Sequence, residues 1–437
     1  MILIRYIILF VSLLSISLTA QAFDGFSLGM AGNYTAISRG VEAIAWNPAN
    51  LSMYRSTNFE MNFIAANAAL FNSSLSVNDY NTYFTTHGHN GYWSDSDKKQ
   101  ILNSFSGDGL RMNMDFATNV FGIAAGNFGF GIQLIGNGQA QIRAGKPLEI
   151  FLFGETIETD YSFKEKDVID ASMFSAVKNS IAYSYLFRMD RSFYSISHLA
   201  IGGSFNYYLG LTAAITLAST VSMNRVDLDG LNSDEELFRY ETHLKAQTAD
   251  PGQGIAGTGM GIDLGLTARF ARAWHFSLAF SNLFGSINWY GHTQFVDYGQ
   301  VDSVFIRNSK PDTHNEFETK VEGKSFRTSL PVQMRMGLSL RMLADLKLSM
   351  DYHQGLNTAF GNSTVPRVGF GAEYKIFNWL PVRSGFAAGG KEVFLFGTGF
   401  GIHAGPIALD FSYAMCKAIL PVYSNGVFTS FSFKLLL

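Results

Sequence analysis

The feature that most constrains this chain is a period of two in hydrophobicity that recurs along most of its length. In segment after segment, apolar residues alternate with small, polar or charged ones, most clearly over residues 335–342, 346–352, 367–376 and 407–414. A period of two belongs to the β-strand, because successive side chains of a strand point to opposite faces. The sequence therefore predicts an all-β fold.

Two all-β architectures share this pattern: a soluble sandwich hides its apolar face, whereas a membrane barrel turns that face toward lipid. The strand-like segments run about 9–11 residues or longer, which is the length that a tilted strand needs to cross a bilayer. Charged residues make up only 15% of the chain, against about 25% in typical soluble domains. With 43 Gly, 39 Phe and 19 Tyr, the composition favours a transmembrane antiparallel β-barrel.

The N-terminus has the three parts of a secretory signal peptide. Arg5 precedes the apolar run from Tyr6 to Leu14, and Ala20-Gln21-Ala22 forms a small-x-small cleavage site. A membrane anchor is the weaker alternative, because the apolar run is too short to span about 30 Å of hydrocarbon. We expect residues 1–22 to be removed during export and the mature chain to reach the outer membrane of a Gram-negative bacterium.

About fourteen strand-like segments lie between Thr57 and Leu437, and single-chain bacterial barrels have even strand numbers. The last segment presents one apolar face that ends at Leu437, where such barrels more often end in an aromatic residue. Pairing this segment with the first strand would remove an aggregation-prone edge. The polar stretches 78–106, 154–175, 226–257 and 295–328 are interpreted as long loops, with local helix over Lys98–Phe105.

Charged residues on the polar faces of these strands are expected in the barrel lumen, because a cation at the bilayer midplane would cost about 2–4 kcal/mol. We expect a lumenal charge network that braces the barrel and its N-terminal segment. Its members would be Arg335, Arg341, Lys347, Asp351, Arg367, Glu373, Arg383 and Asp410.

The segment that follows the signal peptide does not have the pattern of a membrane strand. Small residues dominate residues 23–52, and Asn47-Pro48 marks a turn. Small side chains allow a backbone to fold tightly in a confined space. The expected division is a signal peptide over 1–22, a lumenal segment over 23–52 and a barrel over 53–437.

This segment resembles the N-terminal hatch of FadL-type outer-membrane proteins. Gly29-Met30-Ala31-Gly32 is followed by Ala43-Ile44-Ala45-Trp46-Asn47-Pro48-Ala49-Asn50-Leu51, similar to the Asn-Pro-Ala motif that precedes the first strand in that family. Later stretches are similar to the PorV branch and to related FadL-like barrels, and the resemblance runs from about residue 23 to the C-terminus. They are Gly261–Leu266, Leu278–Leu283, Ile287–Trp289, Leu330-Pro331, Gly371–Tyr374 and Val382–Phe386.

The resemblance implies a fourteen-stranded barrel with a lumenal hatch, in which Asn47, Pro48 and Ala49 form the hatch motif. For the FadL branch it implies uptake of long-chain fatty acids or other hydrophobic small molecules; glycines such as Gly122, Gly202-Gly203 and Gly389-Gly390 would open a route through the wall. For the PorV branch it implies an accessory barrel in protein secretion or surface attachment, with a secreted protein as partner. A structural barrel without transport is the third alternative. Lipid and the barrel assembly machinery are expected partners in every case.

Nothing in the sequence specifies an enzyme, a metal site or a cofactor. His87-Gly88-His89 has no third ligand at suitable spacing, and Asp351 with His353 has no specific nucleophile opposite. The Gly-rich stretch 254–261 is not followed by a helix, so it is not a phosphate loop. The single Cys416 is interpreted as an apolar filler, and a net charge of −3 gives no footprint for nucleic acid.

Overall fold

The computed structural model describes most of the chain outside the expected signal peptide. The described residues are 25–54, 59–85, 93–105, 109–143, 148–149, 152–153, 163–189, 196–226, 237–252, 254–271, 273–305 and 311–437. Residues 1–22, their cleavage site and His87–His89 lie outside these ranges.

Fourteen antiparallel strands form a closed barrel, as the period of two predicted. Each strand pairs with the next around the barrel, and the last pairs with the first from Glu60↔Leu436 to Phe71↔Gly426. The closing role expected for the C-terminal strand is therefore confirmed. In order, the strands are β1 (Phe59–Asn72), β2 (Leu110–Ala125), β3 (Phe128–Ile142), β5 (Ile169–Arg188), β6 (Ile196–Val226), β8 (Gly257–Phe270), β9 (Trp274–Trp289), β13 (Gln333–Arg341), β14 (Leu346–Gly355), β15 (Arg367–Phe377), β16 (Leu380–Gly389), β17 (Val393–Ala404), β18 (Ile407–Cys416) and β19 (Gly426–Leu436).

The two faces of these strands have the inverted polarity of a membrane barrel. On β15, Phe370 and Tyr374 point outward and are 46% and 48% exposed, whereas Glu373 points inward and is 2% exposed. Such a polar interior is stable only when its groups bond to one another, and lipid would stabilise the apolar exterior. None of the helices in the described residues has the length and apolar character needed to cross a bilayer.

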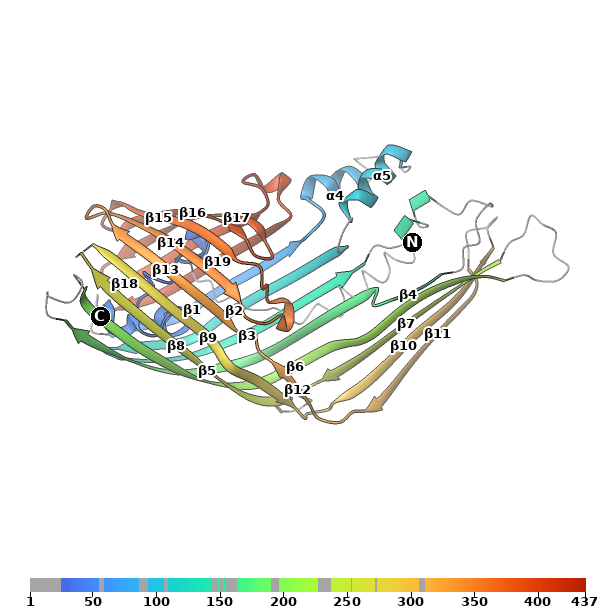
Figure 1. Ribbon diagram of the computed structural model, residues 1–437, viewed down its shortest axis with the longest axis horizontal. Coiled ribbons are helices and arrows are strands. Elements are labelled where there is room, and N and C mark those ends of the chain that lie inside the picture. The colour runs from blue at the N-terminus through green and yellow to red at the C-terminus, as the bar shows by residue number, and fades with distance from the viewer. Residues whose placement is uncertain are drawn as a thin grey trace.

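One side of the barrel continues into a sheet that extends past it, and this corrects part of the sequence prediction. β6 is 31 residues long; its first half pairs with β5 and β8, and its second half pairs mainly with β7 (Leu237–Ala249). β7 pairs with β10 (Gln294–Phe305), which pairs with β11 (Pro311–Glu322). The shorter β4 (Phe163–Lys166) and β12 (Phe326–Ser329) pair with β6 and β9. Figure 1 shows β7, β10 and β11 projecting together beyond the barrel strands.

The prediction that 154–175, 226–257 and 295–328 are loops is therefore wrong in large part. The prediction failed because it assumed that every strand has an apolar face. All side chains of β11 from Asn315 to Glu322 are exposed, so no face of that strand has to be apolar.

The two ends of the barrel differ. One end, here the turn end, has mostly short connections and lies beside Leu437; the other, the loop end, has the longer ones. The loop end includes α4 (Val77–Phe84) and α5 (Asp95–Ser104), which begin with capping boxes at Ser76 and Ser94 (Figure 1). The helix expected near Lys98 is confirmed. The loop-end connections also include the short helices η3 (Ala359–Gly361) and η4 (Pro421–Tyr423).

Residues 25–54 fold into the lumen as a series of short helical turns. These are η1 (Leu28–Met30), η2 (Gly40–Glu42), α2 (Ala43–Trp46) and α3 (Asn50–Met53). Nearly all of their residues are buried, including polar ones such as Ser27 and Asn50 at 0% exposure. We call residues 25–54 the hatch.

Candidate functional site in the barrel lumen

Inward-pointing glycines of the barrel wall form one side of the seat of the hatch. A Cβ added to Gly385 or Gly371 would collide with Met30, and one added to Gly397 would collide with Leu28. These glycines lie on neighbouring strands β15, β16 and β17. The hatch backbone therefore approaches the wall more closely than any larger residue would allow.

The opposite wall receives the Asn-Pro-Ala motif in the same way. A Cβ on Gly202 would collide with Pro48 and Ala49, and one on Gly265 would collide with Asn47. Gly202 pairs with a residue on each side, as do Gly203 and Gly122. Gly389 pairs on both sides too, and Gly390 sits in the β16–β17 turn. These glycines therefore leave no gap in the wall of this structure, although the register shifts beside Gly122, between Asn119 and Phe121. That they open a route stays a prediction.

Side-chain hydrogen bonds fix the motif in its seat. The Asn47 amide donates to the Leu266 carbonyl (3.3 Å) and to the Thr267 hydroxyl (3.0 Å), while its oxygen accepts from the Ala49 N–H (3.1 Å). Thr267 donates in turn to Asn50 Oδ1 (2.6 Å). Pro48 fixes the turn between these two asparagines.

Asp351 anchors the hatch from the facing wall. Its Oδ2 atom accepts hydrogen bonds from the backbone N–H groups of Tyr34 (2.9 Å) and Thr35 (2.7 Å), and lies 3.3 Å from His353 Nε2. Beside it, the Arg335 guanidinium lies over the Trp46 ring, 4.9 Å from its centroid, and donates to the Ala45 carbonyl (3.2 Å). Two residues predicted for the charge network thus bind the hatch directly.

A second group of the predicted residues forms a compact ion cluster nearer the turn end. Arg383 donates to Glu373 (3.0 Å) and Asp410 (2.6 Å), and Lys347 donates to Glu373 (2.8 Å). The Arg383 side chain is fully buried, and the Phe26 ring of the hatch covers its guanidinium at 3.7 Å. Both carboxylates are 2% exposed, so the cluster depends on this arginine for its charge balance.

The remaining predicted residues lie apart from this cluster. Arg367 faces Glu392 at 3.9 Å near the loop end, whereas Arg341 is exposed at the turn end of β13. The structure also adds charged pairs that the sequence analysis did not single out. Lys434 pairs with Glu42 of the hatch, and Lys391 pairs with Asp115 at 2.9 Å. Burial alone would lower the pKa of Lys391, but the carboxylates of Asp115 and Glu392 raise it.

The hatch packs against the wall in two apolar clusters, and a third apolar cluster, which contains no hatch residue, lies toward the loop end. Phe360, on the β14–β15 connection, inserts into it, and its ring centroid lies 4.5 Å from that of Phe174. Phe360 is 6% exposed, and its backbone is left-handed at φ 47° and ψ 45°, which is unfavourable for a bulky residue. We call this the lumenal apolar cluster; its buried members are Ala117, Ile135, Phe174, Ala176, Tyr208, Ala213, Ala249, Ala256, Ile287, Trp289, Leu330 and Phe360.

The barrel wall beside this cluster is irregular. The ladder of β9 with β13 reaches only Ser281↔Gln333, and that with β12 starts at Ser286↔Ser329. Between them, Asn282 and Phe284 both have φ 57°, and Phe284 is 86% exposed. We call residues 282–285 the wall bulge.

Hydrogen bonds hold the wall bulge to the lumen and to the facing chain. The Asn282 N–H donates to Asp263 (2.7 Å), its amide donates to the Pro331 carbonyl (2.9 Å), and its oxygen accepts from the Tyr208 hydroxyl (2.6 Å). The Phe360 loop is tied to the same facing segment, since Asn357 donates to the Leu330 carbonyl (2.8 Å) and Asn362 to the Val332 carbonyl (2.9 Å). The Phe360 loop and the wall bulge are thus both hydrogen-bonded to residues 330–332.

The sequence analysis missed Phe360, Trp289 and the wall bulge. Trp289 sits in a stretch that the resemblance did include, but nothing in its sequence neighbourhood marks the ring as lumenal. Among the described residues, no group of three or more His, Cys, Asp or Glu side chains is placed to hold a metal ion. Cys416 is buried in β18.

Comparisons with known proteins agree on the fold. The model of the family of unknown function DUF5723 matches residues 48–411, and no curated protein matches the sequence. The toluene transporter TodX of Pseudomonas putida superimposes with a TM-score of 0.51 at 11% identity, covering 95% of this chain and 98% of TodX. The toluene transporter TbuX of Ralstonia pickettii gives a TM-score of 0.48 at 15% identity, covering 95% and 98% of the two chains. The TodX superposition shows the same fold and confirms the barrel expected from the FadL-type resemblance.

Proposed function

The chain belongs to the family of unknown function DUF5723, and we propose that it is an outer-membrane channel for the uptake of hydrophobic small molecules, long-chain fatty acids among them. The observation that carries this proposal is the lumenal apolar cluster. The lumen of an ordinary porin is polar and filled with water, which is an unfavourable environment for a cluster of aromatic rings. An apolar compound could replace the Phe360 side chain against Phe174 and gain similar contacts.

The proposed route begins at the loop end and leaves the barrel sideways. A ligand that displaces Phe360 would lie beside Tyr208 and Trp289, next to the wall bulge. The hatch blocks the axial path beyond, because its seat leaves no room along the glycines of both walls. A gap opening between residues 282–285 and 330–332 would release the ligand into the membrane, where an apolar compound is stable. The charge network would serve to keep the hatch seated while this happens.

A solved structure of the same fold supports the proposed substrate class. TodX, which superimposes on this chain with a TM-score of 0.51, is named as a toluene transporter. Export by the N-terminal signal peptide and insertion by the barrel assembly machinery belong to the same proposal.

The decisive experiment is uptake by a deletion strain. Cells that lack the gene would receive radiolabelled long-chain fatty acids, alkanes and monoaromatic hydrocarbons in turn, and a plasmid copy would restore the protein. Reduced uptake of at least one class, restored by the wild-type copy, is expected. Unchanged uptake across the whole panel, together with an altered set of surface and secreted proteins, would instead favour the accessory role in secretion.

A matched pair of variants separates transport from mere presence of the barrel. Tyr208→Phe removes the hydroxyl that binds Asn282 and keeps the ring, whereas Tyr207→Phe changes an outward, 41% exposed residue on the same strand. We expect Tyr208→Phe to change the uptake rate and Tyr207→Phe to leave it unchanged at equal surface abundance.

A further inference from the structure

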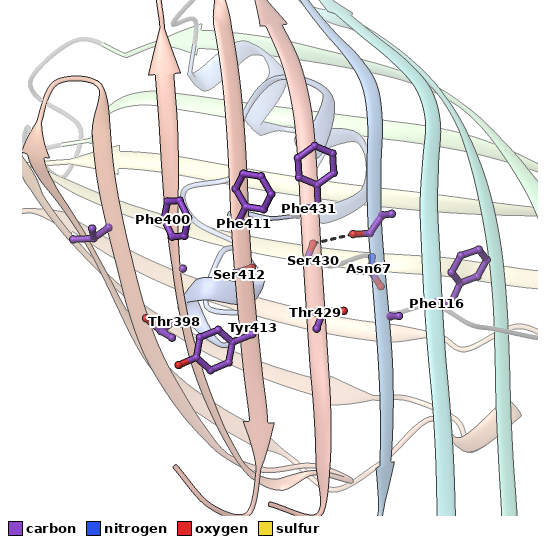
Figure 2. A pocket seen from close by; sticks show the side chains of 14 residues that line it. Asn67, Phe116, Thr398, Phe400, Phe411, Ser412, Tyr413, Thr429, Ser430 and Phe431 are labelled. Carbon is purple, nitrogen blue, oxygen red and sulfur yellow. Dashed lines mark hydrogen bonds between the residues drawn. The ribbon is translucent and has the colours of Figure 1, made fainter. Parts of the chain in front are cut away.

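A groove crosses the outer face of the barrel on the side where the barrel closes. Its volume is about 810 Å³, and it runs over β16, β17, β18, β19, β1 and β2. Figure 2 shows the rings of Phe400, Phe411 and Phe431 side by side on three neighbouring strands, with Phe116 on the far side of β1. The groove lies near the middle of these strands and opens on the face that points away from the lumen.

The strand register explains why this surface is hollow. From one strand to the next, Phe400 pairs with Phe411, Phe411 with Phe431, and Phe431 with Ala66. A row of three rings therefore ends at an alanine. The ring centroids are 5.6 Å and 4.9 Å apart, which is close enough for the three rings to support one another. Two residues further along β1, on the same face, Ala68 lies between Thr429 of β19 and Phe116 of β2. Two small side chains on β1 thus form a floor between aromatic walls.

The chemistry of the groove restricts what can occupy it. The Ser430 hydroxyl donates to the Ala66 carbonyl (3.3 Å), and the Thr398 hydroxyl donates to the Arg383 carbonyl (3.2 Å). These two hydroxyl groups are therefore already bonded within the wall, and the other polar side chains of the lining are uncharged: Asn67, Ser412, Tyr413 and Thr429. The surface offers shape and apolar contact without charge, so it suits hydrocarbon better than a polar ligand.

The size of the groove also suits a hydrocarbon chain. The volume falls within the roughly 300–1,000 Å³ of ordinary small-molecule pockets. Six strands about 4.8 Å apart give a length of roughly 24 Å from the first strand to the last. Because barrel strands are tilted by about 35–45°, a groove that crosses them extends roughly 14–17 Å along the membrane normal, close to the ~15 Å half-thickness of a bilayer core. One acyl chain of a membrane lipid can lie along the groove.

We propose that this groove is a binding site for one acyl chain of a membrane phospholipid or glycolipid, held longer than the chains that contact the rest of the barrel exterior. The site is separate from the proposed transport route, which leaves the barrel through β9 and β13. Its failure would therefore leave the proposed function untouched. A bound chain would stabilise the β19–β1 pairing, because it contacts residues on both strands.

Photo-crosslinking tests the site on the full mature protein in lipid nanodiscs. The probe is a phosphatidylethanolamine that carries a diazirine in the middle of one palmitoyl chain, and the labelled peptides are identified by mass spectrometry. We expect labels on residues 66–68 and 429–431 to exceed those on outward residues of the opposite wall, such as Ile181 and Phe205, by fivefold or more.

Two tryptophan variants make the test specific. Ala68→Trp fills the floor and is expected to abolish the excess labelling, whereas Ala372→Trp, at an outward alanine on β15 outside the groove, is expected to leave it intact. Both changes lie on the apolar exterior, and a heat-dependent gel shift verifies that each barrel is folded; Ala68→Leu replaces Ala68→Trp if the latter does not fold. Even labelling around the barrel, or an undiminished excess of labelling in the folded Ala68→Trp variant, would overturn the proposal.

Discussion

Removal of the Phe360 ring is the most informative perturbation of the proposed entrance. Burial of a phenylalanine side chain stabilises the docked loop by about 1.5–3 kcal/mol, whereas a left-handed backbone at a bulky residue costs about 1–3 kcal/mol. The two terms nearly cancel, so the ring and its backbone together favour the docked loop by at most about 2 kcal/mol. The hydrogen bonds of Asn357 and Asn362 add roughly 0.5–1.5 kcal/mol each.

Phe360→Ala loses the burial term and keeps the backbone cost. The undocked population should therefore rise by about 10- to 150-fold, since 1.4 kcal/mol corresponds to a factor of ten. Hydrogen exchange of the backbone amides in residues 356–366, measured in nanodiscs, reports this population directly. Leu356→Ala is the matched control, because Leu356 lies on the same loop, is 48% exposed and does not belong to the lumenal apolar cluster.

A glycine variant sharpens the test. Glycine usually destabilises a site more than alanine does, but at φ 47° it removes a cost of about 1–2 kcal/mol that alanine retains. Amide exchange in Phe360→Gly should therefore be no faster than in Phe360→Ala. Equal exchange in Phe360→Ala and the wild type would refute the reasoning, as would faster exchange in the glycine variant.

Three further predictions concern the hatch. Gly202→Leu should unseat Pro48 and Ala49 and make the hatch sensitive to added protease, whereas Gly203→Leu, one residue along with its nearest neighbours at 3.7 Å, should behave like the wild type. Arg383→Met leaves the buried carboxylates of Glu373 and Asp410 with only Lys347 and His403 beside them, which should cost about 3–5 kcal/mol in urea unfolding; adding Glu373→Gln and Asp410→Asn should recover part of the loss. Asn47→Ala removes two hydrogen bonds to the wall and should weaken the seat by about 1–3 kcal/mol, seen as faster amide exchange over residues 43–53, with Asn425→Ala at the loop end as control.

The sequence was most informative where two different environments select alternate residues. Lipid outside and a crowded lumen inside impose opposite demands on Phe370 and Gly371, so their strand is evident from the period of two. From Asn315 to Glu322, β11 exposes the side chains of both faces and carries no such alternation, which is why its Glu- and Thr-rich segment was mistaken for a loop. The count of fourteen survived because only strands that cross the barrel have the two-sided pattern.

The candidate site likewise has residues that the sequence could place and residues that it could not. Asp351, Glu373 and Arg383 could be placed in the lumen because a charge in lipid is so costly. Their partners could not, because the pairing of Lys434 with Glu42 depends on how the hatch folds. Phe360 is the extreme case, since a lone phenylalanine in a polar connection gives no indication of where its ring will pack. The glycines were visible, but only the seated hatch reveals why they are small.

The relative cost of moving each part favours the sideways route over displacement of the hatch. To leave its seat, the hatch would break the bonds that it receives from or makes to Asp351, Thr267, Ser184, Ser349 and Arg335. At 0.5–1.5 kcal/mol for each of these five residues, that is on the order of 2.5–7.5 kcal/mol, before Phe26 uncovers the buried Arg383. The Phe360 loop is held by the hydrogen bonds of Asn357 and Asn362, about 1–3 kcal/mol together, and by a ring whose packing is largely offset by its own backbone. An apolar ligand supplies the contacts that replace this ring but none of the polar bonds that hold the hatch. Ligand binding can therefore shift the loop and leave the hatch in place.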